Sequence, residues 1–287
     1  MKTIRYPLIL ALALMSVLRI AASDFHQHLG LQLYSLREQI KTDLPGALDL
    51  LKGYGLTEVE AAGSPSVPID DYAKLLKDRG LVAIGAHFSY ELLTTDLAGA
   101  IHNAKVLGIK HATVPWIPHS DKDGLTTAQA HQAATDFNKW GAAFKAEGIA
   151  FSYHPHGYEF KPYPDEGGAS GFDIIVNETK SELVGFEMDV FWAVHAGQDP
   201  VKLLQKLGKR WVLMHVKDMR KGAITGLFSG HAAPIDNVAV GDGQIDWKAV
   251  LAAAQKAGVQ HYFIEDETTT PLTCIPASLN YLRALKL

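Results

Sequence analysis

The feature that most constrains the fold is an eightfold alternation between apolar runs and amphipathic stretches, which begins near Leu29. The apolar runs have the length and composition of buried strands, and several amphipathic stretches end at a glycine before the next run. Strands buried on both sides and joined by helices are typical of parallel sheets. The eight predicted strands are residues 30–34, 57–61, 81–87, 111–115, 150–154, 183–189, 211–215 and 261–265.

Eight such units predict an α/β fold, a single (β/α)8 TIM barrel over residues 24–287. An open doubly wound sheet is the alternative, but it needs a glycine-rich phosphate turn after its first strand. Residues 32–37 contain no glycine. The longest irregular segment, residues 219–244, follows the seventh strand, and a long loop at the C-terminal face of a barrel is typical of a substrate lid.

Residues 1–23 have the features of a secretory signal peptide rather than of a barrel segment. Lys2 and Arg5 precede an apolar run at residues 7–18, and small residues follow at 21–23. Because that run is shorter than the ~20 residues that span a bilayer, we expect no stable membrane insertion. The sequence therefore predicts an exported protein, periplasmic or secreted, with a buried N-terminal helix as the alternative.

Polar residues end the fifth to the eighth predicted strands: His154, Asp189, His215 and Glu265. Each alone is more often a hydrogen-bonded structural residue, but parallel strands bring their carboxyl ends to one face of a barrel. A buried carboxylate is costly unless it is paired or coordinated. The four residues together predict one divalent metal ion, and their oxygen and nitrogen donors suit Mn²⁺, Co²⁺, Zn²⁺ or Mg²⁺.

Further polar and aromatic side chains are expected at the same barrel mouth. Gln32 and Glu60 point inward near the first two strands, and His87 ends the third. Trp116 and Trp192 follow the fourth and sixth strands, where their faces suit the C–H faces of a sugar, although ordinary packing is an equal alternative. These five residues are the predicted substrate-binding set for a ligand rich in hydroxyl groups.

Residues beside the predicted ligands are candidates for proton transfer or substrate binding. His156 and Glu159 follow the fifth strand, where the alternative is a solvated loop that the Glu caps. Lys217 shares a strand face with His215. Glu187 shares a face with Asp189 and is expected either to orient a ligand or to pair with Lys217.

At these positions the chain resembles the sugar phosphate isomerase/epimerase family with the xylose-isomerase-like TIM barrel, in the branch near the inosose dehydratases. The superfamily also includes the AP endonuclease 2-like enzymes. The segments that carry the resemblance are residues 30–37, 153–156, 159–160, 189–192, 196–200, 215–218 and 264–265. The resemblance covers nearly all of the chain after residue 23, and it does not specify a substrate.

The resemblance implies one divalent metal ion, usually Mn²⁺. In the family's ketose epimerases, the ligands on strands five and eight are both Glu and shuttle the proton. Glu265, Asp189 and His215 match the family pattern, whereas His154 stands where relatives have Glu; whether His154 or Glu159 is the strand-five ligand stays open. This departure favours elimination over symmetric epimerisation, with Glu265 as ligand and base.

The resulting prediction is a metal-dependent enzyme that removes a proton α to the carbonyl of a sugar or keto-sugar, as an isomerase/epimerase or as a lyase/dehydratase. The catalytic candidates are Glu265, His156, Glu159 and Lys217. A net charge of −4 disfavours nucleic acid as a partner. An exported sugar-binding barrel without turnover and an endonuclease-IV-like repair enzyme are the alternatives, and a homodimer is left open.

Overall fold

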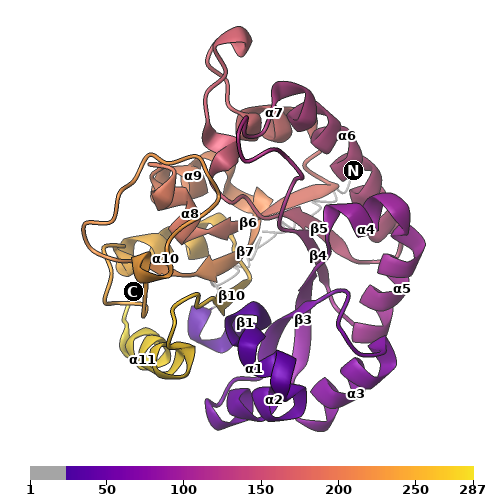
Figure 1. Cartoon of the computed structure of the whole chain (residues 1–287), viewed down its shortest axis with the longest axis vertical. Coiled ribbons are helices and arrows are strands. Elements are labelled where there is room, and N and C mark those ends of the chain that lie inside the picture. The colour runs from indigo at the N-terminus through magenta and orange to yellow at the C-terminus, as the bar shows by residue number, and fades with distance from the viewer. Residues whose placement is uncertain (1–23) are drawn as a thin grey trace, which may run out of the picture.

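The computed structural model describes residues 24–287, and its strands close into a barrel surrounded by helices (Figure 1). The predicted signal peptide, residues 1–23, lies outside the described residues. The barrel strands are β1 Leu29–Gln32, β2 Glu58–Ala62, β3 Val82–His87, β4 His111–Val114, β5 Ala150–Tyr153, β6 Val184–Asp189, β7 Trp211–Val216 and β10 His261–Ile264.

All eight neighbouring pairs in the barrel are parallel, and β1 closes the barrel between β2 and β10. The prediction of a single (β/α)8 TIM barrel is therefore confirmed. Each predicted strand overlaps an observed one. The first ends earlier than predicted because the side chain of Gln32 accepts a hydrogen bond from the backbone N–H of Tyr34, 3.1 Å away, and the 3-10 turn Leu33–Leu36 begins there.

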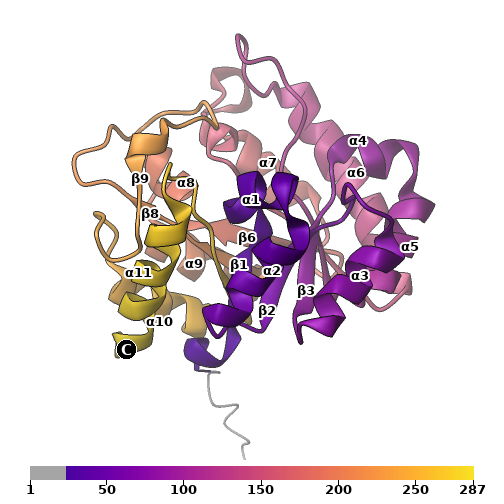
Figure 2. The same cartoon turned by 60° about the horizontal axis from the view of Figure 1, so that its bottom comes forward.

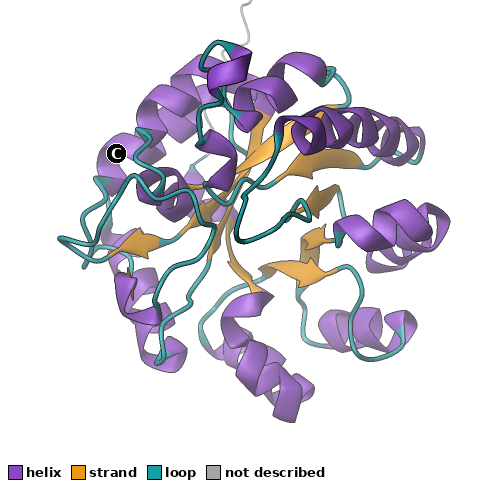
Figure 3. Ribbon diagram, turned by 45° about the horizontal axis from the view of Figure 1, so that its top comes forward, coloured by secondary structure: helices purple, strands orange, loops and turns teal. Residues whose placement is uncertain are grey.

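Helices form the outer layer, as Figure 3 shows. They are α1 Arg37–Thr42, α2 Leu44–Gly53, α3 Ile69–Asp78, α4 Tyr90–Thr95, α5 Leu97–Leu107, α6 Thr127–Ala146, α7 Gly171–Glu178, α8 Val190–His195, α9 Pro200–Leu207, α10 Trp247–Ala257 and α11 Pro271–Ala284. Side-chain caps begin several of them: Asp96, for example, accepts a hydrogen bond from the backbone N–H of Gly99 at 2.8 Å before α5. Among the described residues, no helix combines the length and apolar character needed to cross a bilayer.

Two glycines make room for large side chains inside the barrel. A Cβ atom at Gly30 would lie 2.8 Å from the ring of Phe263, and one at Gly85 would lie 3.1 Å from Oε1 of Glu60. Contacts this short would force the neighbouring side chain to shift. Phe263 and Glu60 therefore occupy interior space that β1 and β3 leave free.

The segment after β7 has more regular structure than predicted. Within residues 219–244, β9 (Asn237–Val238) pairs antiparallel with β8 (Asp218–Met219), and Figure 2 shows β9 in orange. Gly230 and His231 of this segment border the pocket described below. Its movement as a lid stays a prediction.

Candidate active site

The carboxyl ends of the barrel strands bring ionisable side chains together in the interior. Strand register sets their mutual positions: Asp189 of β6 pairs with His215 of β7, and His215 pairs with Phe263 of β10. Because side chains alternate along a strand, Glu187 and Asp189 share the inward face of β6. The buried polar and charged residues at this end include Gln32, Glu60, His154, Glu187, Asp189, His215, Lys217 and Glu265.

His215 lies at the centre of this group, with one ring nitrogen toward each of two carboxylate pairs. Its Nδ1 is 3.2 Å from Oε2 of Glu265 and 3.8 Å from Oδ2 of Asp189. Its Nε2 is 2.6 Å from Oε2 of Glu60 and 3.3 Å from Oε1 of Glu187. The ring can therefore offer Nδ1 to a cation while a carboxylate holds Nε2, an arrangement common around ligating histidines.

His154 has the same kind of surroundings. Its Nδ1 lies 3.0 Å from Oε2 of Glu187, and its Nε2 lies 3.7 Å from Oδ2 of Asp189. Among the described residues, neither Nε2 of His154 nor Oδ2 of Asp189 has a hydrogen-bond partner, although both atoms are buried. Metal–ligand bonds of roughly 2.0–2.2 Å place two donors of one ion about 3–3.5 Å apart, so these unpartnered donors suit a shared cation.

The predicted metal ligands fall into two overlapping groups. Asp189, His215 and Glu265 each offer a donor atom within 4.8 Å of the others. His154 belongs to a second group, with His87, Glu187 and His215, whose donor atoms also lie within 4.8 Å of one another. Asp189 links the two groups, because its Oδ2 lies within 3.8 Å of both His154 and His215.

Charge pairing shapes the ionisation of the site. Burial opposes protonation of His87, but the charge of Glu60 and a hydrogen bond to Glu187 outweigh it and raise the pKa of His87 to about 10. Burial likewise opposes protonation of His215, whose pKa Glu187 and Glu265 raise well above its usual value. These same contacts hold the pKa of Glu187 well below its usual range against burial. The interior is therefore built to hold positive charge among carboxylates.

Lys217 forms an ion pair with Glu265. Its Nζ donates to Oε2 of Glu265 at 3.3 Å and also to Glu267. The ammonium group lies over the rings of Phe191 and Trp192, at 5.1 and 5.0 Å from their centroids. Lys217 is buried and does not border the pocket, so the structure places it as a partner of Glu265 rather than beside a substrate.

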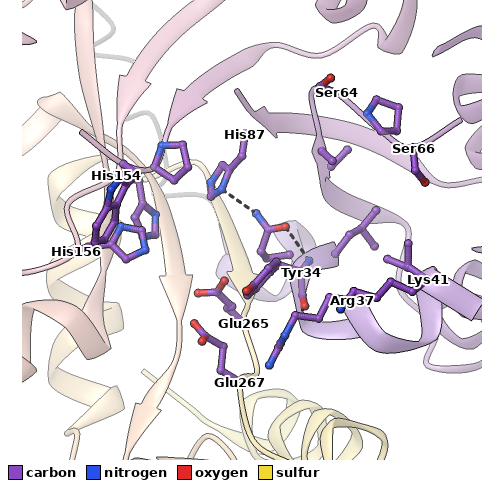
Figure 4. Close-up of a pocket in the computed structure, with 18 of the residues that line it drawn as sticks. Tyr34, Arg37, Lys41, Ser64, Ser66, His87, His154, His156, Glu265 and Glu267 are labelled. Atoms are coloured by element: carbon purple, nitrogen blue, oxygen red, sulfur yellow. Dashed lines mark hydrogen bonds between the residues drawn. The ribbon is translucent and has the colours of Figure 1, made fainter. Parts of the chain in front are cut away.

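The site opens into a pocket of about 680 Å³ at the barrel mouth (Figure 4). Of the predicted substrate-binding residues, Gln32, His87, Trp116 and Trp192 border it. Glu60 does not: it is fully buried, where it accepts a hydrogen bond from Gln32 at 2.7 Å. The structure thus places Glu60 behind the pocket wall, contrary to its predicted contact with substrate.

His156 borders the pocket between two aromatic side chains. Its ring centroid lies 5.4 Å from that of Trp116, 5.4 Å from that of Trp192 and 4.6 Å from that of His154. Burial, followed by the neighbouring His154 and Lys217, lowers the pKa of His156 well below its usual value. It is therefore a neutral imidazole that can donate or accept a hydrogen bond.

The predicted position of Glu159 near the substrate is not what the structure shows. Glu159 is fully buried, accepts a hydrogen bond from the hydroxyl of Tyr153, and accepts another from the backbone N–H of His156 at 3.1 Å. Burial raises its pKa to about 7. Glu159 does not border the pocket. Its hydrogen bond from His156 holds the loop after β5 in place, which resembles the alternative role of a Glu that caps this loop.

The outer half of the pocket was missed in the sequence analysis. It is bordered by Tyr34, Arg37 and Ile40, which follow β1, and by residues 64–66, which follow β2. Two indications were available: the loops after the strands of a barrel gather at its active face, and Tyr34 and Arg37 lie in the segment 30–37 that carries the family resemblance. No charge pattern or spacing marked these side chains.

The profile of the family described as "Xylose isomerase-like TIM barrel" matches residues 48–285 of this chain. The chain belongs to this family. An inosose dehydratase of Mesomycoplasma hyopneumoniae (strain 7448) is 25% identical over 272 residues, which cover 89% of this chain and 85% of that protein.

Solved structures of other proteins share the barrel. A sugar phosphate isomerase/epimerase from Parabacteroides distasonis ATCC 8503 has a TM-score of 0.72 and 25% identity, covering 90% of this chain and 98% of that one. The IOLI protein with a bound zinc atom has a TM-score of 0.65 and 16% identity, covering 89% and 95%, which shows the common fold. The relatives of this xylose isomerase-like barrel are thus isomerase/epimerase and dehydratase enzymes.

Proposed function

We propose that this protein is a divalent-metal-dependent enzyme that removes the proton next to the carbonyl of a sugar or keto-sugar and then eliminates a neighbouring oxygen substituent. The position of Glu265 carries the proposal. This carboxylate borders the pocket, and its Oε2 lies 3.2 Å from Nδ1 of His215 in the predicted ligand set. One group therefore faces both the ion site and the substrate space.

The residues fit a divalent ion held by His154, Asp189, His215 and Glu265. The unpartnered buried atoms of His154 and Asp189 supply donors of the kind that Mn²⁺, Co²⁺, Zn²⁺ and Mg²⁺ accept. A bound ion would supply a Lewis acid for the substrate carbonyl. Mn²⁺ is the proposed ion, on the family resemblance.

Within this proposal Glu265 is the base. Lys217 donates to it at 3.3 Å, and this charge, against burial, holds the pKa of Glu265 well below its usual range, so the carboxylate is ionised before the reaction. The proton that Glu265 takes from carbon then passes to the departing oxygen, which leaves as water or an alcohol. His156 is placed to hold that oxygen with its N–H.

Elimination is favoured over epimerisation because the pocket is asymmetric. Its bordering carboxylates in the described chain, Glu265 and Glu267, both follow β10. The wall from β5 carries His154 and His156 instead. A two-base epimerase needs a base on each face of the substrate carbon, and imidazoles and carboxylates are not equivalent bases. The identity with inosose dehydratases supports the same choice.

The experiment is turnover on a panel of keto-sugars and inososes in D₂O, followed by mass spectrometry. The proposal expects loss of water or an alcohol from the product; deuterium uptake with all oxygens retained would assign an isomerase or epimerase instead. A bound metal without any turnover would support the sugar-binding alternative. Export to the periplasm or medium is part of the proposal, and N-terminal sequencing of the protein from its host should find a start near residue 24.

A further inference from the structure

The pocket is larger than the inner site alone requires. A volume of about 680 Å³ is in the middle of the range, roughly 300–1,000 Å³, of pockets that hold drug-sized ligands. It extends from His154 and Glu265 to Ser64 and Ser66, on the opposite side in Figure 4. A sugar ring bound at the inner residues would leave the outer half for another part of the substrate.

The outer half differs in chemistry from the inner half. Its walls include Ile40, Leu44, Pro65 and Tyr72, which offer mostly carbon to a ligand. Sugar hydroxyls that faced these four side chains would lose hydrogen bonds to water without replacing most of them, which is unfavourable. The outer half therefore suits an apolar group better than a second sugar.

Tyr34 provides a flat aromatic surface beside this outer half. Its side chain is 54% exposed, and the guanidinium of Arg37 lies 4.6 Å from its ring centroid. Arg37 also donates from Nη1 to the backbone oxygen of Tyr34 at 3.1 Å, which fixes the pair. An exposed, held aromatic ring is a surface on which another planar ring can stack.

The charges of the pocket disfavour a phosphate in this half. The lysine and arginine bordering it in the described chain are Lys41, which pairs with Glu38 at 2.8 Å, and Arg37, which is stacked on Tyr34. Glu265 and Glu267 border the same pocket and would repel an anion. Phosphate sites usually present several free cationic donors, whereas both cations that border this half are already engaged and Ser64 and Ser66 add only neutral hydroxyls.

We propose that the outer half binds a planar, uncharged, aromatic group that is joined to the sugar by a C–O bond and departs in the reaction. The inference rests on the proposed elimination. Glu265 takes the proton next to the carbonyl, a C=C bond forms in the ring, and the C–O bond to the aromatic group breaks with its electron pair. The oxygen receives the proton, so a phenol leaves and no other reactant is consumed.

Binding of unreactive probes tests the outer half without any turnover. Phenyl β-D-glucoside, methyl β-D-glucoside and glucose 1-phosphate lack the carbonyl, and their affinities are measured by calorimetry with the metal-loaded full chain. We expect phenyl glucoside to bind about tenfold more tightly than methyl glucoside, the gain of one stacked aromatic pair. Equal affinities, no detectable binding of phenyl glucoside, or tighter binding of glucose 1-phosphate would each overturn the inference.

Variants of Tyr34 locate the effect. Because this side chain is half exposed, Tyr34→Ala should fold normally, as a thermal melt checks. It should abolish the preference for the phenyl probe, and Tyr34→Phe should retain it. Ile235→Ala, which removes a 71% exposed apolar side chain that does not border the pocket, is the matched control. A preference unchanged in Tyr34→Ala would contradict the assignment.

The two proposals fail in different ways. If keto-sugars are turned over but the probes show no aromatic preference, the proposed reaction stands and the outer-half inference falls. If the preference is present but no keto-sugar or aryl keto-glycoside reacts, the reaction falls and the aromatic binding surface stands.

Discussion

The two nitrogens of His215 differ in their partners, and this difference organises the centre of the barrel. Nδ1 faces Asp189 and Glu265, and Nε2 faces Glu60 and Glu187. A histidine whose second nitrogen is held by a carboxylate is fixed in its ring orientation, and its free nitrogen becomes a better ligand. The sequence predicts that Glu187 either orients a ligand or pairs with Lys217. In the structure its Oε2 lies 3.0 Å from Nδ1 of His154 and 3.0 Å from Nε2 of His87.

Replacing Glu187 by glutamine tests this orienting role. We expect Glu187→Gln to weaken metal binding by about 10–100-fold, because the contact to His154 loses its charge while no proposed ligand is removed. Affinity is measured by competition with a chromophoric chelator. Glu178→Gln, at a side chain 44% exposed, is the control. Equal affinity in wild type and Glu187→Gln would show that Glu187 does not support the site.

Glu265→Gln tests the proposed base. Glutamine keeps an oxygen for the ion but cannot accept the proton, so turnover should fall by about 10²–10⁴-fold while the thermal melt changes little. Glu91→Gln, an exposed replacement on α4, should be inert. Full activity of Glu265→Gln in a metal-replete assay would remove this residue from the mechanism.

At the scale of elements, buried polar contacts fix both ends of the barrel. At the active face, Asp218 of β8 accepts hydrogen bonds from Gly241 at 2.9 Å, Gly243 at 3.2 Å and the indole of Trp247 at 2.9 Å. These contacts hold the end of the segment that was predicted as a lid. At the opposite face, Glu58 at the start of β2 lies between His28 and His261.

Asp218→Asn should loosen the segment after β7. The asparagine side chain has an NH₂ group in place of one carboxylate oxygen, and this group would face the N–H groups from which Asp218 now accepts hydrogen bonds. Because those buried donors would lose their acceptor, we expect the free energy of unfolding to fall by about 1–3 kcal/mol. Limited proteolysis should cut residues 219–244 faster than in wild type. Asp242→Asn, at an exposed neighbouring position, is the comparison. Unchanged stability and cleavage would mean that Asp218 does not anchor this segment.

Glu58 gives the opposite face a defined pH dependence. Burial raises its pKa, but hydrogen bonds from His261 at 2.7 Å and His28 at 3.2 Å outweigh burial and hold the pKa below its usual value. A lowered carboxyl pKa stabilises the fold above the unfolded value of about 4.3, and this contribution disappears as the pH falls through the folded value. Glu58→Gln should cost about 1 kcal/mol at pH 7 and nothing once wild-type Glu58 is protonated. Denaturant melts at several pH values measure this, and a pH-independent difference would contradict it.

At the scale of the whole molecule, the barrel could be predicted because periodicity is a local property. Strand 150–154 was identified from its apolar run alone, and the structure has Ala150–Tyr153. Strand order then placed Asp189, His215 and Glu265 together. The direction of side chains in the loops could not be predicted. Glu159 points into the core, where it accepts a hydrogen bond from Tyr153. Tyr34 borders the pocket in the turn after β1, which the side chain of Gln32 caps.

The outer half of the pocket is likewise a property of the assembled molecule. Tyr34, Leu44 and Pro65 come from the segments after two different strands and meet only when the barrel closes. No spacing in the sequence relates them. In this account, the residues proposed to select the substrate meet only in the folded barrel. The residues proposed for the chemistry lie at strand ends that can be recognised in the sequence.

Metal titration of chelator-treated protein, with bound ion and turnover measured in the same samples, tests the central claim most directly. We predict that turnover rises in proportion to bound Mn²⁺ and saturates at about one ion per chain, as expected for a single four-ligand site. Asp189→Ala should retain neither ion nor activity. Turnover that is independent of the ion, or full ion binding by Asp189→Ala, would contradict the account.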